Sequence, residues 1–387
     1  MTLCSRLCET LCCLHDGVHG SAARVPDSAT EEERLEAAYV MGARLDEDDP
    51  ANSSAVHEAS CRRSGRPVRL KLVEHTGVDA DRELRVLQRV GSHRHVASLL
   101  SSYELRRHLA LVLERPSGGE VLEVLAARGP FSERDASHLV RQLAAALEHL
   151  QQLGVAHRNV QPDRLRHESD VAGAPLKLCD FSMAVVGQKG PAGTASRGAS
   201  SAVAAAIDGT AGFMSPEVLR GEAHGPPTDA WNLGVFTYIL LAGRHPFDVD
   251  GRGSDSAVNA RVLRGQWGFA GEPAACYVCW RHVSAEARQA TRLLLEDAPE
   301  RRLTAAQLLQ GGWLQTVRRG VATPMPGAER QLEAFNRARR QRSASVRMAR
   351  QVAANCALSP PAAGAAGSGS PRQQLRGCRP ASPALLG

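Results

Sequence analysis

The sequence predicts an α+β fold in which strands dominate the first part of the chain and helices dominate the rest. A strand-like pattern begins at Tyr39, and Leu109–Glu114 is a short apolar strand. After these strands, leucines at helical spacing form one apolar stripe. They are Leu139, Leu143, Leu147 and Leu150. With 387 residues, of which 43% are hydrophobic, the chain is long enough for one large domain or two.

Composition argues against two kinds of site. The formal net charge is +6, and only three of the 47 basic residues are lysines, Lys71, Lys177 and Lys189. A nucleic-acid interface would cluster basic residues with aromatic ones, but aromatic residues make up only 4% of the chain. The Cys276–Cys279 pair at Cys-x-x-Cys spacing has no second pair to complete a zinc site. We therefore expect no nucleic-acid partner and no zinc ion.

Residues 1–36 are predicted to be a disordered, cysteine-containing leader. They lack the apolar region and the small-residue cleavage site of a signal peptide. The clustered cysteines at the start could carry palmitate, but plain disorder is the reading we favour. The longest apolar run, near Val235 to Ala242, is too short to cross a bilayer. We expect a cytoplasmic location without a transmembrane segment.

Two stretches about twenty residues apart carry the functional prediction. Residues His157 to Leu165 read H-R-N-V-Q-P-D-R-L, and residues Leu176 to Ser182 read L-K-L-C-D-F-S. The first stretch resembles the catalytic loop of the protein kinases, whose usual form is H-R-D-L-K-P-E-N-L. The second resembles the strand and the D-F-G turn that follow that loop.

Further landmarks of the protein kinases occur in the same order and spacing. They are V-R-L-K at Val68–Lys71, G-G-E at Gly118–Glu120, G-T-A-G-F-M-S-P-E at Gly209–Glu217, D-A-W-N-L-G at Asp229–Gly234, L-A-G-R-H-P-F at Leu241–Phe247 and R-L-T at Arg302–Thr304. The resemblance implies a bilobal kinase fold over residues 37–314, with a small β-rich N-lobe at 37–115 and a larger helical C-lobe at 116–314. Within the family, the chain resembles the calmodulin-dependent group and, more loosely, the titin and obscurin type of muscle kinase.

The resemblance assigns roles to the residues that match. Lys71 would grip the α- and β-phosphates of ATP, and Glu83, on a helix, would pair with it. Leu113 would be the gatekeeper beside the adenine pocket, with Glu114 opening the hinge. Asp180 would bind the metal. Structural positions fall on His157, Arg158, Phe181, Glu217, Asp229 and Arg302, with a buried bridge between Glu217 and Arg302.

The chain departs from the family at the positions that perform chemistry. Asn159 replaces the aspartate that takes the substrate proton, a loss of roughly 10²–10⁴ in rate. Gln161 replaces the lysine that neutralises the phosphoryl group, a loss of roughly 10²–10³. Arg164 replaces the asparagine that holds the second metal ion, and Ser182 replaces the D-F-G glycine. The segment at the position of the Gly-rich loop, Asp46–Ser54, is acidic and has no glycine.

These departures predict a pseudokinase, a kinase-fold scaffold or allosteric partner with phosphotransfer absent or severely impaired. ATP and Mg²⁺ binding is expected to be weak or absent, although Lys71 and Asp180 are retained. A low-activity Ser/Thr kinase is the first alternative. A calmodulin-responsive interaction module is the second.

Residues 315–356 are predicted to be a basic, partly helical segment of regulatory type. Leu332, Phe335 and Met348 lie among many arginines, a pattern typical of calmodulin targets. Calmodulin binding through 328–350 is one reading, and a solvated basic helix packed loosely on the C-lobe is the one we favour. Ser343 and Ser345 each have an arginine three residues before them. Residues 357–387 are predicted to be a disordered tail rich in Pro, Ala and Ser.

Overall fold

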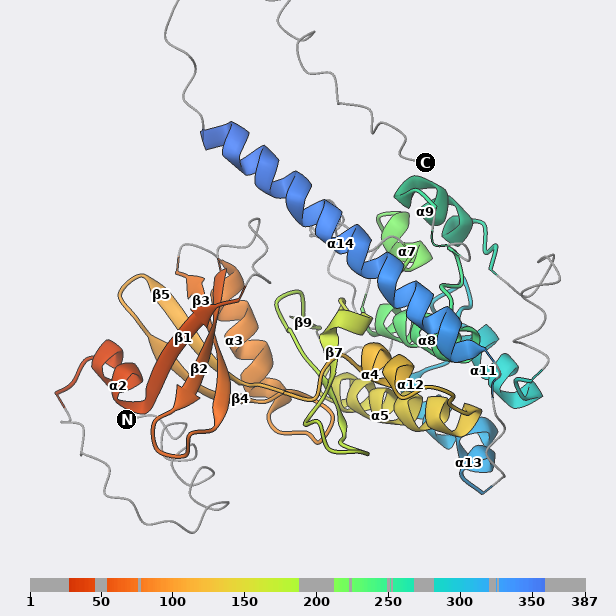
Figure 1. Ribbon diagram of the computed structural model, residues 1–387, viewed down its shortest axis with the longest axis horizontal. Coiled ribbons are helices and arrows are strands. Elements are labelled where there is room, and N and C mark those ends of the chain that lie inside the picture. The colour runs from red at the N-terminus through yellow and green to blue at the C-terminus, as the bar shows by residue number, and fades with distance from the viewer. Residues whose placement is uncertain are drawn as a thin grey trace, which may run out of the picture. The chain divides into compact units, whose positions relative to one another are not determined.

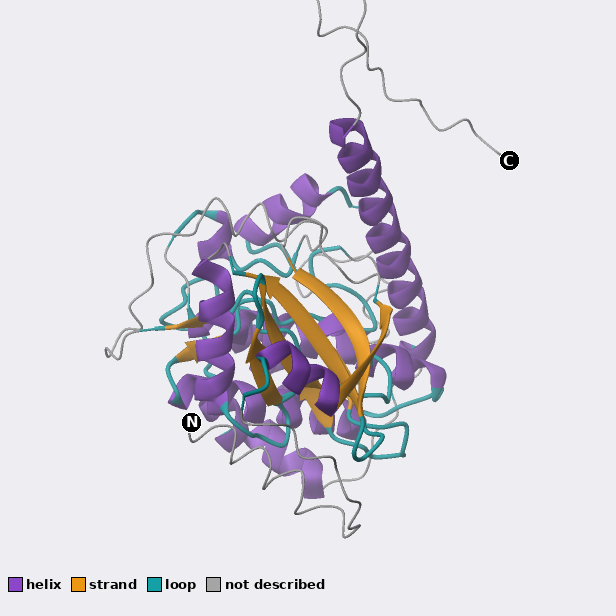
Figure 2. Ribbon diagram, turned by 90° about the vertical axis from the view of Figure 1, so that its left-hand side faces the viewer, coloured by secondary structure: helices purple, strands orange, loops and turns teal. Residues whose placement is uncertain are grey.

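The N-terminal lobe is built on one antiparallel sheet of five strands in the order β1-β2-β3-β5-β4 (Figures 1 and 2). The strands are β1 (Tyr39–Arg44), β2 (Ser54–Cys61), β3 (Pro67–Glu74), β4 (Leu99–Glu104) and β5 (His108–Glu114). The computed structural model describes residues 28–45, 54–75, 78–187, 212–222, 225–248, 251, 253–267, 282–319, 325 and 327–358.

The centre of the sheet is β3, which pairs with β2 on one side and β5 on the other. Successive side chains of a strand point to opposite faces. Val68 and Leu70 are therefore buried in a small cluster with Val112 of β5, while Lys71 lies on the other face, opposite Leu111 in the register.

A helix precedes the sheet, and it corrects one prediction. Helix α2 (Glu31–Ala38) lies partly within the leader that we predicted to be disordered. Thr30 and Glu33 form a capping box at its start, and Leu35 is buried against the sheet. One well-placed apolar residue and a complete cap are enough to order a short segment that composition marks as polar. The cysteine cluster of the leader lies outside the described residues.

Helix α3 (Val78–Val90) lies beside the sheet (Figure 1). Its inner face is apolar: Leu87 and Val90 are buried, and Leu84 packs against the main core. Glu83 is buried on the same helix, so α3 carries this carboxylate toward β3.

The C-terminal lobe is mainly helical, as predicted. Its helices are α4 (Val121–Ala127), α5 (Glu133–Gln152), α7 (Pro216–Leu219), α8 (Pro226–Ala242), α9 (Asp255–Leu263), α11 (Ala285–Leu294), α12 (Ala305–Gln310), α13 (Gly312–Arg319) and α14 (Ala328–Leu358). Helix α5 begins with a capping box formed by Ser132 and Asp135, and it buries the predicted leucine stripe. Helix α8 is buried on all sides, because nearly every residue from Thr228 to Ala242 is inside the core.

Two small sheets position the functional loops. Strand β6 (Val155–Ala156) pairs with β9 (Val185–Val186), and β7 (Leu165–His167) pairs with β8 (Leu176–Leu178). Within the catalytic-loop stretch, residues Pro162–Arg164 form a 3-10 turn, η1, that leads directly into β7. The strand β9 lies shortly after the D-F-S turn, and residues 188–211, which follow it, lie outside the described residues.

The C-terminal helices pack more closely than we predicted. Helix α13 crosses the expected boundary at residue 314. In α14, Leu332 and Asn336 are buried, so its first part is not a loosely packed solvated helix. The described residues up to Val346 belong to one compact unit, and those from Arg347 to Leu358 fall in a second one. The predicted tail beyond Leu358 lies outside the described residues. Among the described residues, no helix is long and apolar enough to cross a membrane.

Candidate functional site

Lys71 and Glu83 form a buried ion pair between β3 and α3. Lys71 Nζ lies 2.9 Å from Glu83 Oε1 and 2.7 Å from Oε2. Burial disfavours the charge on Lys71, but the carboxylates of Glu83 and Asp180 outweigh it and raise the pKa of Lys71 above its usual value. Burial also raises the pKa of Glu83, and the two-oxygen contact with Lys71 holds the pair in its ionised form. The pair that the sequence suggests is therefore present.

The catalytic-loop stretch is held by Asp229 of α8. Asp229 Oδ2 accepts a hydrogen bond from the backbone N–H of His157 (2.8 Å), and Oδ1 accepts one from that of Arg158 (2.7 Å). These bonds hold Arg158 in a left-handed backbone conformation, φ 67°, which costs about 1–3 kcal/mol for a residue with a side chain. His157 Nε2 donates to the carbonyl of Cys179 at 3.2 Å, and its ring packs edge-on against Phe181.

Asn159 and Gln161 contact one another. Gln161 Nε2 donates a hydrogen bond to Asn159 Oδ1, and both side chains are buried. Both amides are neutral. The pair therefore supplies neither a base that could take a hydroxyl proton nor a positive charge for a transferring phosphoryl group.

Arg164 and Asp180 form the ion pair that most sets this site apart. Arg164 Nε lies 2.9 Å from Asp180 Oδ2, and Arg164 Nη1 lies 3.1 Å from Asp163 Oδ2. The other oxygen, Asp180 Oδ1, accepts a hydrogen bond from the Ser182 backbone N–H at 3.2 Å. Burial opposes ionisation of Asp180, but the charges of Arg164 and Lys71 outweigh it and hold its pKa well below the usual range.

The Mg²⁺ ions that kinases use do not fit these residues as they are arranged. A kinase holds its two metal ions with the D-F-G aspartate and the loop asparagine. Here, both oxygens of Asp180 are engaged, and the asparagine position carries a guanidinium that cannot lose its charge. A metal ion would have to displace Arg164 from Asp180 before it could bind. Among the described residues, no group of three or more His, Cys, Asp or Glu side chains could hold a metal ion.

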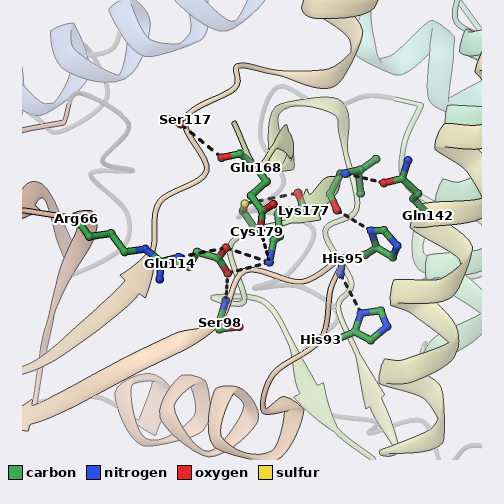
Figure 3. A network of polar contacts seen from close by, with 11 residues as sticks. Arg66, His93, His95, Ser98, Glu114, Ser117, Gln142, Glu168, Lys177 and Cys179 are labelled. Carbon is green, nitrogen blue, oxygen red and sulfur yellow. Dashed lines mark hydrogen bonds and ion pairs between the residues drawn. The ribbon is translucent and has the colours of Figure 1, made fainter. Parts of the chain in front are cut away.

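Figure 3 shows a polar network around the hinge. Glu114 is buried and accepts hydrogen bonds from Lys177 Nζ at 3.2 Å and from the Ser98 backbone N–H at 3.1 Å. Lys177 Nζ also lies 3.5 Å from Glu168. The side chain of Glu114, which we predicted at the cofactor site, is thus committed to a structural network. The neighbouring Leu113 is half-buried and packs against the main core.

Two residues of this region were not predicted. Lys177 pairs with Glu114 and neutralises its charge. In the sequence, its only distinguishing feature is that it is one of three lysines. Arg82 of α3 donates from Nη2 to the carbonyl of Ser182 at 2.9 Å. This bond ties α3 to the D-F-S turn, and no short sequence pattern points to it. The acidic loop at residues 46–53 lies outside the described residues.

The Glu217–Arg302 bridge is present and fully buried. Arg302 Nη1 lies 2.8 Å from Glu217 Oε1, and Nη2 lies 2.9 Å from Oε2. The side chains are 0% and 2% exposed, respectively. Arg302 also donates to the carbonyl of Pro227 and lies 5.1 Å from the ring centre of Trp231. The bridge links α7 to the segment before α12.

Comparison with known proteins agrees with this geometry. The protein kinase domain family matches residues 52–314. Calcium/calmodulin-dependent protein kinase type IV of Homo sapiens is 33% identical over 298 residues, which cover 76% of this chain and 58% of that protein. Type 1B of Rattus norvegicus is 32% identical over 60% of this chain and 62% of that protein. Calcium-dependent protein kinase 26 of Oryza sativa subsp. japonica is 33% identical over 61% of this chain and 40% of that protein.

The chain thus spans less than two thirds of the length of each of these relatives. The family match covers most of the chain and includes the ion pair of β3 and α3, the catalytic-loop stretch, the D-F-S turn and the buried bridge of the C-lobe. The chain belongs to the protein kinase family and is related to the calcium/calmodulin-dependent kinases.

Proposed function

We propose that this chain is a pseudokinase, a kinase-fold scaffold or allosteric partner that transfers phosphate very slowly or not at all. The observation that carries the proposal is the ion pair between Arg164 Nε and Asp180 Oδ2 at 2.9 Å. In kinases, the metal ions bridge the β- and γ-phosphates and neutralise the charge that develops on them. In this chain, the aspartate that would hold such an ion is already paired with a fixed cation.

The neutral pair of Asn159 and Gln161 supports the same proposal. Loss of the general base and loss of one electrostatic stabiliser would together reduce the rate by roughly 10⁴–10⁷, and this product is an upper bound because residues that act as a unit are not additive. Typical kinases turn over at about 1–100 per second. Little useful turnover would remain.

ATP binding is a separate matter from phosphotransfer. Lys71 is a buried cation held by Glu83, as a phosphate-binding lysine would be. In our proposal this pair keeps the small lobe together, and any nucleotide binds weakly and without help from Mg²⁺. The alternative, a low-activity Ser/Thr kinase, would use Lys71 and Asp180 for catalysis after Arg164 had moved away.

A phosphotransfer assay on the full chain separates these two readings. The chain is incubated with γ-labelled ATP, Mg²⁺ and an arginine-containing serine peptide, and both peptide and chain are examined for label. Lys71→Ala is the matched control, because it removes the phosphate-binding cation. Transfer that is absent, or the same in Lys71→Ala, supports the proposal. Transfer above background that is lost in Lys71→Ala would establish the low-activity kinase instead.

A second candidate function is calmodulin binding through residues 328–350. It is favoured by the amphipathic character of α14, in which Leu332 and Phe335 pack against the core while Arg337 and Arg340 lie toward solvent. Met348 is exposed, but because Leu332 and Phe335 pack against the core, calmodulin could reach these two residues only after the helix had left the C-lobe.

A further inference from the structure

Arg69 is the first of two arginines that lie beside the hinge, one in each lobe. On β3, Val68 and Leu70 are buried in the small cluster on the outer face of the sheet, so Arg69 points to the opposite face, together with Lys71. Arg69 stands opposite Leu113 of β5 in the register. In the V-A-I-K strand of the kinases this position is an alanine. The chain therefore has a guanidinium where its family has a single methyl group.

Arg166 is the second arginine, and it belongs to the C-lobe. On β7, Leu165 and His167 are buried, and Arg166 between them is half-buried. Arg166 stands opposite Lys177 of β8 in the register, and directly opposed residues of an antiparallel pair share a face. Lys177 reaches the hinge, where its Nζ lies 3.0 Å from Glu114 Oε1. Arg166 thus shares the face of this small sheet that Lys177 uses to contact the hinge.

The charges of both arginines act on one buried thiol. Burial raises the pKa of the Cys179 thiol to about 12, and the two groups that oppose this rise most strongly are Arg69 and then Arg166. Because Coulomb interactions weaken with distance, both guanidiniums lie in the neighbourhood of this sulfur. Cys179 follows β8, and its Sγ lies 3.7 Å from the carbonyl oxygen of Lys177 (Figure 3). Arg69 and Arg166 therefore approach the same point from the two lobes.

The acidic side chains around the hinge are balanced by other cations. Glu58, which stands opposite Arg69 on β2, pairs with Arg115. The remaining pairs join Glu114 to Lys177 and Arg66, Glu168 to Lys177, and Glu120 to Arg339. Arg69 and Arg166 add two positive charges to this balanced set. The described residues beside the hinge therefore carry a net positive charge.

We propose that Arg69 and Arg166 form a binding site beside the hinge for a small oxyanion of the phosphate class, at the place where kinases hold the base of ATP. The planar guanidinium presents its donors in a fork that matches the oxygens of a phosphate group. Two such groups from opposite lobes bind one ligand between them. The proposal does not rest on the loss of phosphotransfer, which is argued from Asn159, Gln161 and Arg164.

The charge of the site favours an anion over an uncharged base. A purine base offers no negative charge to either arginine, whereas an oxyanion with two charges neutralises both. Two half-buried cations near the same sulfur also repel one another, and a bound dianion removes that repulsion. Because the protein itself supplies the positive charge, the ligand needs no Mg²⁺. The class of ligand is therefore a phosphate compound with at least two negative charges.

Isothermal titration calorimetry of the full chain with inorganic pyrophosphate, at low salt and without Mg²⁺, measures this binding. We expect saturable binding at one site, which weakens as sodium chloride is added because salt screens the charges. Glycerol 3-phosphate is the second probe, and it distinguishes an organic monoester from a diphosphate; saturable binding of either supports the proposal. Adenosine, which has the base but no phosphate, should not bind.

Variants of the two arginines locate the site. Arg69→Gln and Arg166→Gln each remove one guanidinium, so each should weaken pyrophosphate binding about tenfold, and the double variant should abolish it. Arg166→Lys keeps the charge without the fork and should bind more tightly than Arg166→Gln. Arg63→Gln is the matched control, because Arg63 is exposed on the hairpin between β2 and β3. Thermal unfolding of each variant verifies that it is folded.

Three results would overturn the proposal. The first is that the folded wild type binds neither pyrophosphate nor glycerol 3-phosphate at millimolar concentration. The second is that binding is unchanged in both Arg69→Gln and Arg166→Gln, or falls equally in Arg63→Gln, which would indicate unspecific attraction by surface charge. The third is that adenosine binds as tightly as pyrophosphate, which would assign the site to the base of a nucleotide. Each result is independent of the phosphotransfer assay with Lys71→Ala.

Discussion

Arg164 Nε lies 2.9 Å from Asp180 Oδ2, where a kinase would place a metal ion against the D-F-G aspartate. The two charges are held together by the chain itself, with Asp163 contacting the same guanidinium. In our proposal, the permanent cation of Arg164 takes the place of an exchangeable metal ion. Most of what we expect of this protein follows from that exchange.

Arg164→Asn should create a metal site. It would restore an oxygen ligand at this position and free one oxygen of Asp180, so we expect Mn²⁺ to bind saturably when ATP is present. Electron paramagnetic resonance of free Mn²⁺ measures this, with ATP alone as the reference. Arg166→Asn, two residues away and outside the ion pair, is the matched control. Equal Mn²⁺ binding by the wild type and Arg164→Asn would mean that Arg164 does not block the metal.

Glu217→Ala should strongly destabilise the C-lobe. It would leave Arg302 buried without its carboxylate, and breaking one side of such a pair typically costs about 3–5 kcal/mol. Urea unfolding of the full chain gives the free energy of unfolding. Arg220 provides a control, because its pair with Asp297 is exposed, at 35% and 50%, and Arg220→Ala should cost less than about 1 kcal/mol. Similar losses in the two variants would contradict this assignment.

Much of the fold could be predicted because local patterns determine it. The leucine stripe of α5, the cap at Ser132 and the inner face of α3 each depend on residues a few positions apart. The predicted pair of Lys71 and Glu83 is also present. Lys71 lies on β3, and Glu83 lies on α3, the helix that follows this strand in the chain.

The predictions failed where distant residues decide the structure. The network of Glu114 and Lys177 joins residues 63 positions apart, and no periodicity relates them. The docked part of helix α14 has few large apolar residues, and its contact with the C-lobe also uses three acidic partners scattered along the chain, Glu120, Glu123 and Asp248. The hydrogen bond between Gln161 and Asn159 likewise depends on the shape of the loop rather than on spacing.

Stability should fall as the pH drops from about 6.5 to about 4 because of buried histidines. Burial lowers the pKa of His245 to about 4, from 6.5. Between these values the unfolded chain binds a proton that the folded chain does not, so stability rises with pH. The full effect of one such group is about 3 kcal/mol. His157 acts in the same direction, since burial lowers its pKa to about 4 as well.

Buried acids with raised pKa values oppose this trend, among them Glu83, Glu120 and Asp229. Burial raises the pKa of Asp229 to about 6, which by itself would make stability fall as the pH rises from about 4 to 6. Because the pKa values of three histidines, His93, His157 and His245, are all lowered to about 4 and act against these acids, we expect a net gain in stability between pH 4 and 6.5. Urea unfolding at several pH values measures it, and His245→Gln should flatten the curve. A curve unchanged by His245→Gln would rule out this histidine as a cause.

A peptide of residues 328–350 should bind calmodulin in the presence of calcium if the second candidate function is correct. Replacing Leu332 and Phe335 by alanine should abolish binding, because these are the apolar anchors of the helix. The full chain should bind more weakly than the peptide, because its helix is docked. Calcium-dependent pull-down compares all three. No binding of the unmodified peptide at micromolar concentration would exclude this function.

A thermal-shift titration of the full chain with ATP tests most directly whether Arg164 takes the place of the metal at Asp180. We expect the shift, whether small or zero, to be the same with and without Mg²⁺. A ligand at 100 times its dissociation constant adds about 2.7 kcal/mol to the stability of the folded state, so a metal-dependent site would be easily detected. A shift that requires Mg²⁺ and disappears in Lys71→Ala would contradict the claim and indicate a working kinase pocket.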